Sequence, residues 1–198
     1  MKATRNAVTN RSRRAPLGCG AALALVTAFS ATAEAQDTIR DPGKHPVYRI
    51  EVEPHAAVGW DGLYGGAGVG AGLRLSIPIV QDGFIKSIDD SVAIGFGADW
   101  LSYSGCYFDG RCSANYLMFP AALQWNFFLT PHWSVFGEPG AFVYKGFIEH
   151  CTAPGCSEPT SFGVRPAIAV GGRYHFTDHV TLTLRVGYPT ISAGVSFL

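Results

Sequence analysis

The stretch Gly62–Ile77, GLYGGAGVGAGLRLSI, alternates between apolar residues and small or polar residues with a period of two. The period of two indicates a β-strand that buries one face. A strand of a water-soluble domain is usually about 5 or 6 residues long. A strand of sixteen residues with a charge-free apolar face is typical of a wall that crosses a lipid layer. The apolar positions are Leu63, Ala67, Val69, Ala71, Leu73, Leu75 and Ile77.

The composition fits one folded domain. The chain has 198 residues, of which 47% are apolar and 15% are charged, so disorder is not expected. The formal net charge is zero, but the first 35 residues hold five basic side chains and one acidic one. The rest of the chain keeps 10 of the 15 basic and 14 of the 15 acidic side chains. This remainder offers no basic stripe for nucleic acid.

Residues 1–35 are predicted to be a cleaved secretory signal peptide. A basic region ends at Arg14, an apolar run follows from Leu17 to Phe29, and the small residues end in Ala33-Glu34-Ala35. We predict cleavage after Ala35, and a short polar N-terminal tail over 36–44. No later segment is apolar enough for a membrane helix, so a membrane location requires a barrel.

The rest of the chain, 45–198, repeats the pattern of the opening stretch. Asp61-Gly62 and other short turn sequences separate the strands. With the opening strand this gives eight, and we predict an all-β, eight-stranded antiparallel up-and-down transmembrane β-barrel. The further predicted strands are His45–Trp60, Ser91–Tyr103, Ala114–Leu129, Trp133–Ile148, Ser161–Phe176, Val180–Tyr188 and Ile191–Phe197.

Two features place lipid, and not water, on the apolar face. The opposite face carries glycines, aromatic residues and almost no lysine, which suits a packed lumen better than a wetted surface. The large aromatic residues of the apolar face fall at two levels, as the interfacial girdles of a membrane barrel do. One level is predicted to hold Tyr48, Phe127, Trp133, Tyr174, Phe176 and Phe197, and the other Trp60, Trp100, Phe119, Phe162 and Tyr188.

Over about 45–198, the chain resembles the small eight-stranded outer-membrane proteins of Gram-negative bacteria. The resemblance rests on the leader, the strand number, the girdles and the aromatic-ended last strand, ISAGVSFL. It implies a location in the outer membrane, contact with outer-membrane lipid, and recognition of the terminal aromatic residue by the outer-membrane assembly machinery. Here Phe197 is penultimate and Leu198 is last.

Three prolines interrupt the predicted ladder. Pro120, Pro139 and Pro166 fall inside strands, where each removes a backbone donor. We expect a bulge or a kink at each of them.

Charged residues of the inward face are predicted to pair across the lumen, since an eight-stranded barrel is just wide enough for side chains to fill. Glu138 with Arg173 and Arg185 is the expected centre of this network, and glycines such as Gly66 and Gly70 leave room for long side chains. The alternative is a gated polar path. The network is predicted to contain Arg49, Glu51, Glu53, Arg74, Asp99, Glu138, Arg165, Arg173 and Arg185.

Four cysteines follow the leader, in two loops predicted to be exported to an oxidising compartment. We expect disulfides between Cys106 and Cys112 and between Cys151 and Cys156, with bridges between the two loops as the alternative. His150 near Cys151 and Cys156 lacks the spacing of a zinc site. No metal or cofactor is therefore expected.

An enzyme is not expected. The residue types that lipid-modifying or proteolytic barrels need occur here without a recognisable spacing, and GGAGVGAG is not a nucleotide motif. The expected function is a non-enzymatic barrel with a structural or surface-interaction role, and the alternatives are a narrow channel, a carrier of small apolar molecules, or a lipid-modifying enzyme. The enzyme candidates are His55, Asp61, Glu149, His150 and Ser157.

Overall fold

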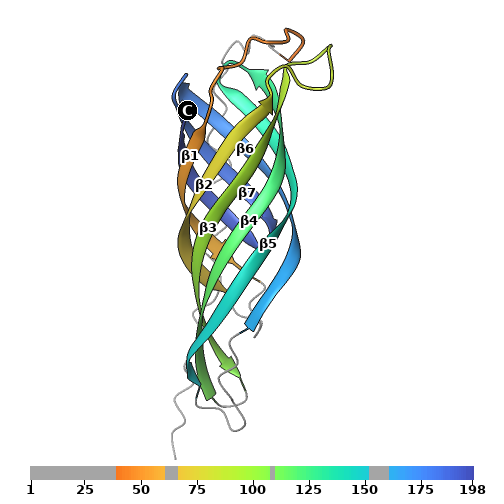
Figure 1. The fold of residues 1–198 in the computed structure, drawn as a ribbon. Helices are drawn as coiled ribbons and strands as arrows, with labels where there is room; N and C mark the ends of the chain where they lie inside the picture. The colour runs from red at the N-terminus through yellow and green to blue at the C-terminus, as the bar shows by residue number, and fades with distance from the viewer. Residues whose placement is uncertain (1–38, 61–66, 108–109, 152–160) are drawn as a thin grey trace, which may run out of the picture. The chain divides into compact units, whose positions relative to one another are not determined.

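The protein forms a closed barrel of eight antiparallel strands, each paired with its neighbours in sequence order (Figure 1). The computed structural model describes residues 39–60, 67–107, 110–151 and 161–198, within a compact unit Gln36–Leu198. The predicted leader lies outside the described residues. The predicted eight-stranded all-β barrel is confirmed. The strands are β1 (Glu51–Gly59), β2 (Gly68–Val80), β3 (Asp90–Tyr107), β4 (Gly110–Thr130), β5 (Trp133–Cys151), β6 (Ser161–Thr177), β7 (Val180–Tyr188) and β8 (Thr190–Phe197).

In the described part of the chain, no helix has the length and hydropathy to cross a membrane.

The register fixes the tilt of the strands. A path around the barrel can start at Phe162 on β6 and move each time to the paired residue of the next strand. It passes through β5, β4, β3, β2, β1, β8 and β7 and returns to β6 at Gly172. The offset of ten residues between Phe162 and Gly172 means that the strands are strongly tilted, by about 40°. At about 3.3 Å per residue, Phe162 lies about 25 Å further along the barrel axis than Gly172.

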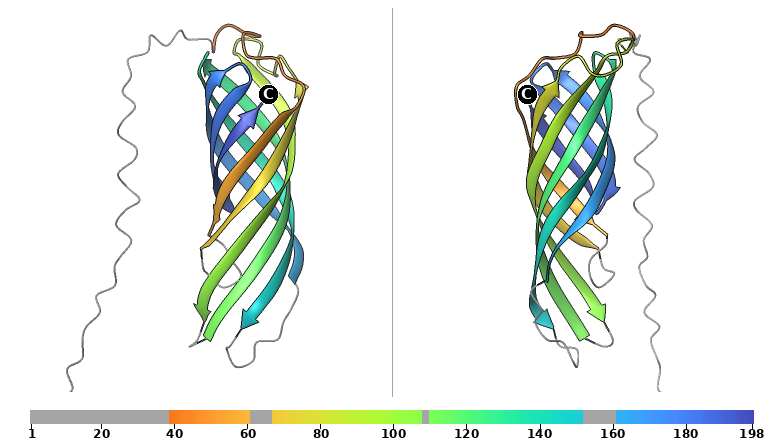
Figure 2. Two further views of the ribbon diagram at one scale, coloured as in Figure 1. Left: turned by 90° about the vertical axis from the view of Figure 1, so that its left-hand side faces the viewer. Right: turned by 45° about the vertical axis from the view of Figure 1, so that its right-hand side comes forward.

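The wall is taller on one side than on the other. β3, β4, β5 and β6 have 17 to 21 residues, whereas β1, β7 and β8 have 8 or 9. The long strands extend beyond the short ones at the end where β3 meets β4 (Figure 2). We call this end the loop end. The opposite end, where residues 39–50 and the C-terminus lie, is called the tail end (Figure 1).

Residues 45–50 do not form part of β1, although the sequence predicted a strand from His45. They lie at the tail end, where Asp89 fixes residues 39–45 through three hydrogen bonds. Its carboxylate Oδ1 accepts from the Gly43 amide at 3.0 Å and pairs with His45 Nδ1 at 2.7 Å, while its amide donates to the Ile39 carbonyl at 2.7 Å. Gly43 has a φ of 79°, which favours glycine. The His45 ring stacks on Phe128, with centroids 4.4 Å apart.

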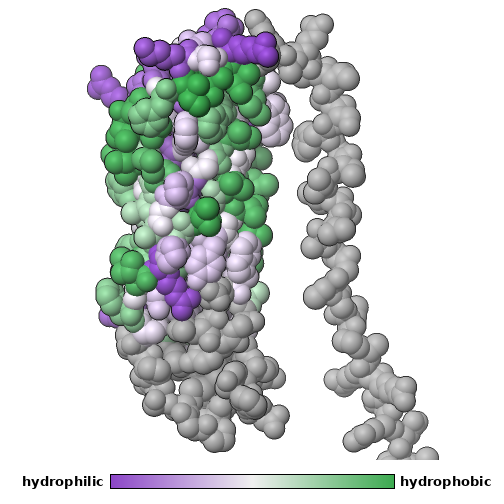
Figure 3. All heavy atoms as spheres, turned by 90° about the vertical axis from the view of Figure 1, so that its right-hand side faces the viewer, coloured by the Kyte–Doolittle hydropathy of each residue, from purple (hydrophilic) through white to green (hydrophobic). Residues whose placement is uncertain are grey.

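The barrel is apolar outside and polar inside. Large apolar side chains such as Val170, Leu184 and Phe96 are 62%, 54% and 41% exposed, while Glu51, Gln124 and Arg185 are 1%, 0% and 2% exposed. Green, apolar residues cover the wall in Figure 3, and purple, polar residues gather at the tail end. A water-soluble protein has the opposite distribution.

The three prolines interrupt pairing without shifting it. Pairing between β3 and β4 is missing opposite Pro120, and pairing between β4 and β5 is missing at Pro139, with the same register before and after each gap. Of the two expected irregularities, the bulge does not form at Pro120 or Pro139, because the ladder omits the pairs and keeps its register; the kink stays a prediction. Pro166 pairs with Ala141 on the β5 side. On its other side, pairing with β7 begins only at Ile168.

A glycine on β6 makes room for an inward aromatic ring, and this contact can be tested. A Cβ atom at Gly171 would overlap the ring of Phe136. We expect Gly171→Ala to displace Phe136 and to lower the free energy of unfolding by about 1–3 kcal/mol, as overpacking does. Urea titration of the protein folded in lipid vesicles measures this.

Gly137→Ala is the matched control, since nothing lies within 4 Å of a Cβ at Gly137. Equal unfolding free energies for the Gly171→Ala and Gly137→Ala variants would contradict the close packing of Gly171 against Phe136.

Candidate functional site

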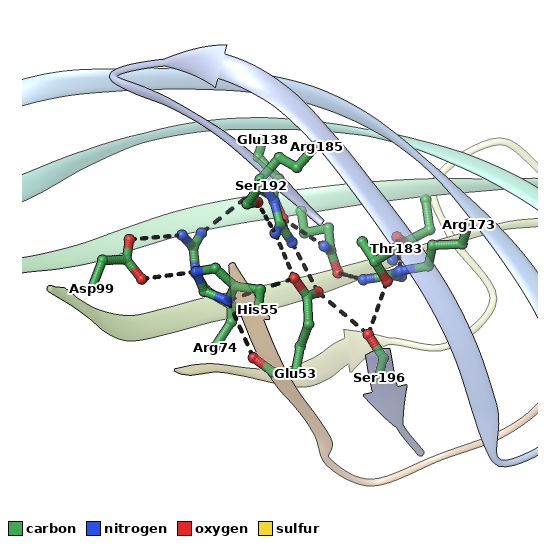
Figure 4. A network of polar contacts seen from close by, with 12 residues as sticks. Glu53, His55, Arg74, Asp99, Glu138, Arg173, Thr183, Arg185, Ser192 and Ser196 are labelled. Atoms are coloured by element: carbon green, nitrogen blue, oxygen red, sulfur yellow. Dashed lines mark hydrogen bonds and ion pairs between the residues drawn. The ribbon is translucent and has the colours of Figure 1, made fainter. Parts of the chain in front are cut away.

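The lumen holds a charged network whose centre is Arg185 on β7. Its guanidinium joins two carboxylates whose strands, β5 and β1, are each two strands away from β7: Nε donates to Glu138 Oε2 at 2.7 Å, and Nη1 donates to Glu53 Oε1 at 2.7 Å. The remaining Nη2 donates to both carboxylates at 3.2 Å. Ser192 accepts from Nη1 at 3.3 Å. Arg185 therefore ties β1, β5, β7 and β8 together through charge-assisted hydrogen bonds (Figure 4).

A second guanidinium, that of Arg173 on β6, extends the network toward the tail end. Its Nη2 lies 2.9 Å from Glu51 Oε1, and it donates to Gln124 Oε1 at 3.1 Å. Gln124 in turn donates to Glu138 Oε1 at 2.6 Å. Arg173 and Glu138 are thus connected through the Gln124 amide and not directly. Asn126 accepts from Arg173 Nη1 at 3.0 Å.

A third cation, Arg74 on β2, extends the network toward the loop end. Its Nη2 lies 3.3 Å from Asp99 Oδ2, and its Nη1 lies 3.9 Å from Glu138 Oε2. Asp99 Oδ1 also contacts His55 Nε2 at 3.0 Å. These Arg74 contacts are longer than those of Arg185, and Arg74 Nε is buried without a hydrogen-bond partner. Arg74 is the least satisfied cation of these three.

The network nearly balances its charges. It contains the four carboxylates Glu51, Glu53, Asp99 and Glu138 against three guanidiniums, and all of these side chains are at most 9% exposed. A buried charge is tolerated when it is paired and hydrogen-bonded. Leaving His55 aside, the network carries one more carboxylate than guanidinium groups.

Aromatic rings surround and cover the charges. Phe136 lies against both central guanidiniums, with its centroid 4.8 Å from Arg173 Cζ and 5.3 Å from Arg185 Cζ. Toward the loop end, an apolar layer fills the lumen (Ala57, Leu101, Tyr103, Ala114, Tyr116, Met118 and Phe142). Tyr103 and Tyr116 pack edge to face with centroids 5.2 Å apart. The lumen is consequently filled by side chains in two layers, one charged and one apolar.

A small cavity lies between these layers. It has room for one or two water molecules, at about 30 Å³. Its charged lining comes from Arg74, Asp99, Glu138 and Arg185, and its apolar lining includes Met118, Phe142, Ala167, Ile168 and Pro189.

Seven of the nine charged residues predicted for the network lie in the lumen wall and contact one another. Arg49 does not, because it is exposed in the segment before β1. Its predicted inward direction was wrong, since it assumed strand alternation in residues that form no strand. Arg165 is half-buried and bonds to the Tyr188 hydroxyl at 3.1 Å, with its guanidinium over the Tyr144 ring.

Neutral and weakly basic members of the network were not predicted. Gln124, Asn126 and Ser192 lie on the predicted inward face but were left out because they carry no charge. His55 was placed on the inward face, but its only predicted role was that of an enzyme candidate, and it is buried beside Asp99. A prediction that had used the inward direction as its only criterion, and had not required a formal charge, would have included all four residues in the network.

Two girdle predictions were also wrong. Tyr48 is only 8% exposed, because it lies in the segment before β1 and packs inside the tail end. Burial raises the pKa of its phenol to about 12. Tyr188 is half-buried and packs on Phe142. Phe127 and Tyr174 are half-buried. The remaining girdle residues are exposed: Trp60, Trp100, Phe119, Trp133, Phe162, Phe176 and Phe197.

Several predicted residues lie outside the described part. Asp61, Cys156 and Ser157 are not described, and neither are the side chains of Cys106, Cys112, Glu149, His150 and Cys151. The described backbone pairs Cys112 on β4 with Cys151 on β5. Among the described side chains, no group of His, Cys, Asp and Glu is arranged to hold a metal ion.

Comparisons with known proteins give structural similarity only. No family model matches the chain. No curated protein matches its sequence. The attachment invasion locus protein Ail of Yersinia pestis is similar at 12% identity, with a TM-score of 0.48, over 75% of this chain and 96% of Ail.

Two further solved structures are similar. Ail in complex with the heparin analogue sucrose octasulfate has 14% identity and a TM-score of 0.46, over 75% of this chain and 96% of Ail. Neisserial surface protein A has 15% identity and a TM-score of 0.45, over 75% of this chain and 94% of that protein.

The coupling between Arg185 and Glu53 is testable. Arg185→Met leaves two buried carboxylates without their main partner, and we expect it to lower the free energy of unfolding by about 3–5 kcal/mol. Adding Glu53→Gln removes one of the uncompensated charges. The double variant should therefore lose less than the sum of the two single variants, by about 0.5–3 kcal/mol. Urea unfolding in vesicles gives all four values, and strict additivity would show that the two side chains do not interact.

Proposed function

We propose that the chain is a non-enzymatic outer-membrane β-barrel whose lumen is closed by its own side chains and whose loops act at the cell surface. The observation that carries this proposal is the ion-pair network inside an apolar wall. All eight strands contribute to it, from Glu53 on β1 to Ser192 on β8. Such a barrel suits lipid outside and offers no open channel within.

The described exposures support a lipid-facing wall. Trp133, Phe176 and Phe197 lie exposed toward the tail end, and Trp100 and Phe119 lie exposed toward the loop end. Aromatic residues favour the two interfaces of a membrane, where their apolar bodies and polar edges are both accommodated. In this proposal the tail end faces the periplasm, because the C-terminus and two tight turns (131–132 and 178–179) lie there, while the long strands extend the wall at the loop end.

The tall half of the wall supports a surface role. β3, β4 and β5 continue toward the loop end past the short strands β7 and β8 (Figure 2). This exposes a strand-supported platform beyond the membrane, where loops contact partners. Outer-membrane lipid and the assembly machinery, which would read Phe197 in the last strand, are the proposed partners. A cleaved leader over 1–35 would direct export.

The location and the closed lumen can be tested on one preparation. The mature chain should appear in the outer-membrane fraction, and its unboiled form should run faster on a gel than its boiled form, because a folded barrel stays compact in detergent. In planar bilayers the same protein should give no steady conductance, since its charged lumen is paired.

Two results would contradict the proposal separately. A soluble protein without a mobility shift would exclude the membrane barrel, whereas a folded barrel with steady current that changes in Glu138→Ala would instead support the narrow channel.

The disulfide arrangement of the loops remains part of this proposal. The sequence favoured bridges within each loop, but the register places Cys112 opposite Cys151. Directly opposed residues of antiparallel strands have Cα atoms about 4.5–5.5 Å apart, which a disulfide can span. We therefore favour the alternative that joins the two loops, with Cys112 bonded to Cys151 and Cys106 to Cys156.

Peptide mapping without reduction decides between the two arrangements. The expected result is a linked pair of peptides that contain Cys112 and Cys151, and reduction should separate them. Linkage of Cys106 to Cys112 would restore the pairing first expected from the sequence.

A further inference from the structure

A second, larger cavity lies at the tail end of the barrel. Its volume is about 330 Å³, which is the size of a site for a small molecule, since such sites begin at about 300 Å³. One side of it is formed by the segment that precedes β1 (Figure 1). We call it the tail cavity and define it by the residues that line it from four parts of the chain: Lys44, His45, Asp89, Phe128, Thr130 and Asp178.

A buried pair of a histidine and a carboxylate lines the tail cavity. Asp89 Oδ1 lies 2.7 Å from His45 Nδ1, and the two side chains are 1% and 2% exposed. An ionised carboxylate can only accept a hydrogen bond, so His45 Nδ1 is the donor. In the neutral imidazole the other ring nitrogen, Nε2, is then an acceptor.

Each member of this pair has an acceptor that the protein leaves unmet. Within the described part of the chain, His45 Nε2 and Asp89 Oδ2 are buried and have no hydrogen-bond partner. A buried acceptor without a donor is unfavourable. The complementary ligand therefore presents N–H or O–H donors to the pair.

The charges around the tail cavity favour a cation. Asp178 lies in the turn between β6 and β7, is exposed, and forms no ion pair with the side chains that the structure describes. The ammonium of Lys44 is balanced by Asp41, at 3.0 Å, which does not line the cavity. The carboxylates of Asp89 and Asp178 therefore leave an excess of negative charge, which stabilises a positive ligand and repels an anion.

The remaining lining is apolar. Phe128 is 4% exposed and stacks on the His45 ring, and two prolines, Pro46 and Pro131, complete this part of the cavity. Such a lining suits a short hydrocarbon stem. A bare metal ion fits less well, because no three His, Cys, Asp or Glu side chains among those described are arranged to hold one.

We propose that the tail cavity binds a primary ammonium group on a short alkyl stem, held between the Asp178 carboxylate and the His45–Asp89 pair. An ammonium combines the positive charge with three donors, which is what the unmet acceptors and the charge excess call for. The inference goes beyond the proposed function. In the proposed orientation the cavity lies on the periplasmic side, so a free amine and a lysine side chain of another protein are the two sources of such a group.

A titration monitored by NMR tests the site in the folded mature chain in detergent micelles. The probe is n-butylammonium chloride, and the protein carries ¹⁵N in its backbone and its histidine rings. We expect a saturable shift of the His45 ring nitrogens and of the amides of 44–45 and 178–179. Sodium chloride at the same concentrations should give no such shift. Butanol and butyrate should bind at least about tenfold more weakly, because one lacks the charge and the other has the opposite charge.

A pair of variants locates the binding. Asp178→Asn removes a charge from the cavity at nearly constant size, and it should weaken n-butylammonium binding about tenfold. Asp82→Asn is the matched control, since Asp82 is an exposed acid of the loop between β2 and β3 that does not line the cavity. It should leave the affinity unchanged. The gel mobility shift shows that each variant is folded.

A second ligand distinguishes the two sources of the ammonium group. Nα-acetyl-lysine methylamide carries the same head and stem as n-butylammonium but adds the peptide backbone of a lysine residue. Tighter binding of this peptide analogue would support a lysine side chain of a partner protein. Equal or weaker binding would support a free amine.

Three outcomes would overturn the inference in a barrel that still shows the mobility shift. One is the absence of a saturable shift with n-butylammonium. Another is equal binding of butanol, which would remove the requirement for a charge. The third is an equal loss of affinity in Asp178→Asn and Asp82→Asn, which would show that the amine responds to the surface charge of the tail end and not to the tail cavity.

Discussion

Charge compensation in a lumen filled by side chains is the constraint on which the structure depends. Four carboxylates are at most 4% exposed, and each costs several kcal/mol to bury unless a cation meets it. Arg185 satisfies two of them at once from β7, which lies midway between their strands β1 and β5. Because Glu53 and Glu138 belong to strands that are not neighbours, their shared cation fixes the cross-section of the barrel as well as its charge. Closure of the ladder gives the backbone groups of the strands their hydrogen-bond partners. Arg185 gives two of the buried carboxylates their charged partner.

The two ends of the barrel are closed by different means. At the tail end the chain itself covers the opening, with His45 held between the Asp89 carboxylate and the Phe128 ring. Toward the loop end the covering is a layer of inward side chains, among them Tyr103 and Tyr116, on strands that continue well past their shorter neighbours. A substrate that crossed the barrel along its axis would have to displace both. Both coverings therefore close the lumen to traffic along the axis.

The sequence predicted which strand residues point inward, because alternation determines that direction. It did not predict where β1 begins or which charges pair, because alternation determines neither. A period of two assigns a face to every residue of a strand, so Glu51, Asp99 and Arg173 were placed inward correctly from their position alone. The same rule failed for Tyr48 and Arg49, because nothing in the alternation of those residues shows that the strand begins only at Glu51. It also failed to give the partner of each charge. Which charges pair depends on the ten-residue offset around the barrel, and this offset is known only once the pairing of the strands is known.

Proline positions link the fold to the place where the ladder between β6 and β7 ends. A closed ladder has no free donor to lose, so prolines within it must cost pairs, as the gaps at Pro120 and Pro139 show. Pro166 avoids this cost only because β7 ends before reaching it. The shortness of β7 therefore explains why β6 can hold a proline at position 166 without losing a ladder pair to β7. Together they end the β6–β7 ladder at the pair Ile168 and Tyr188, beside the cavity that Arg74, Asp99, Glu138 and Arg185 line.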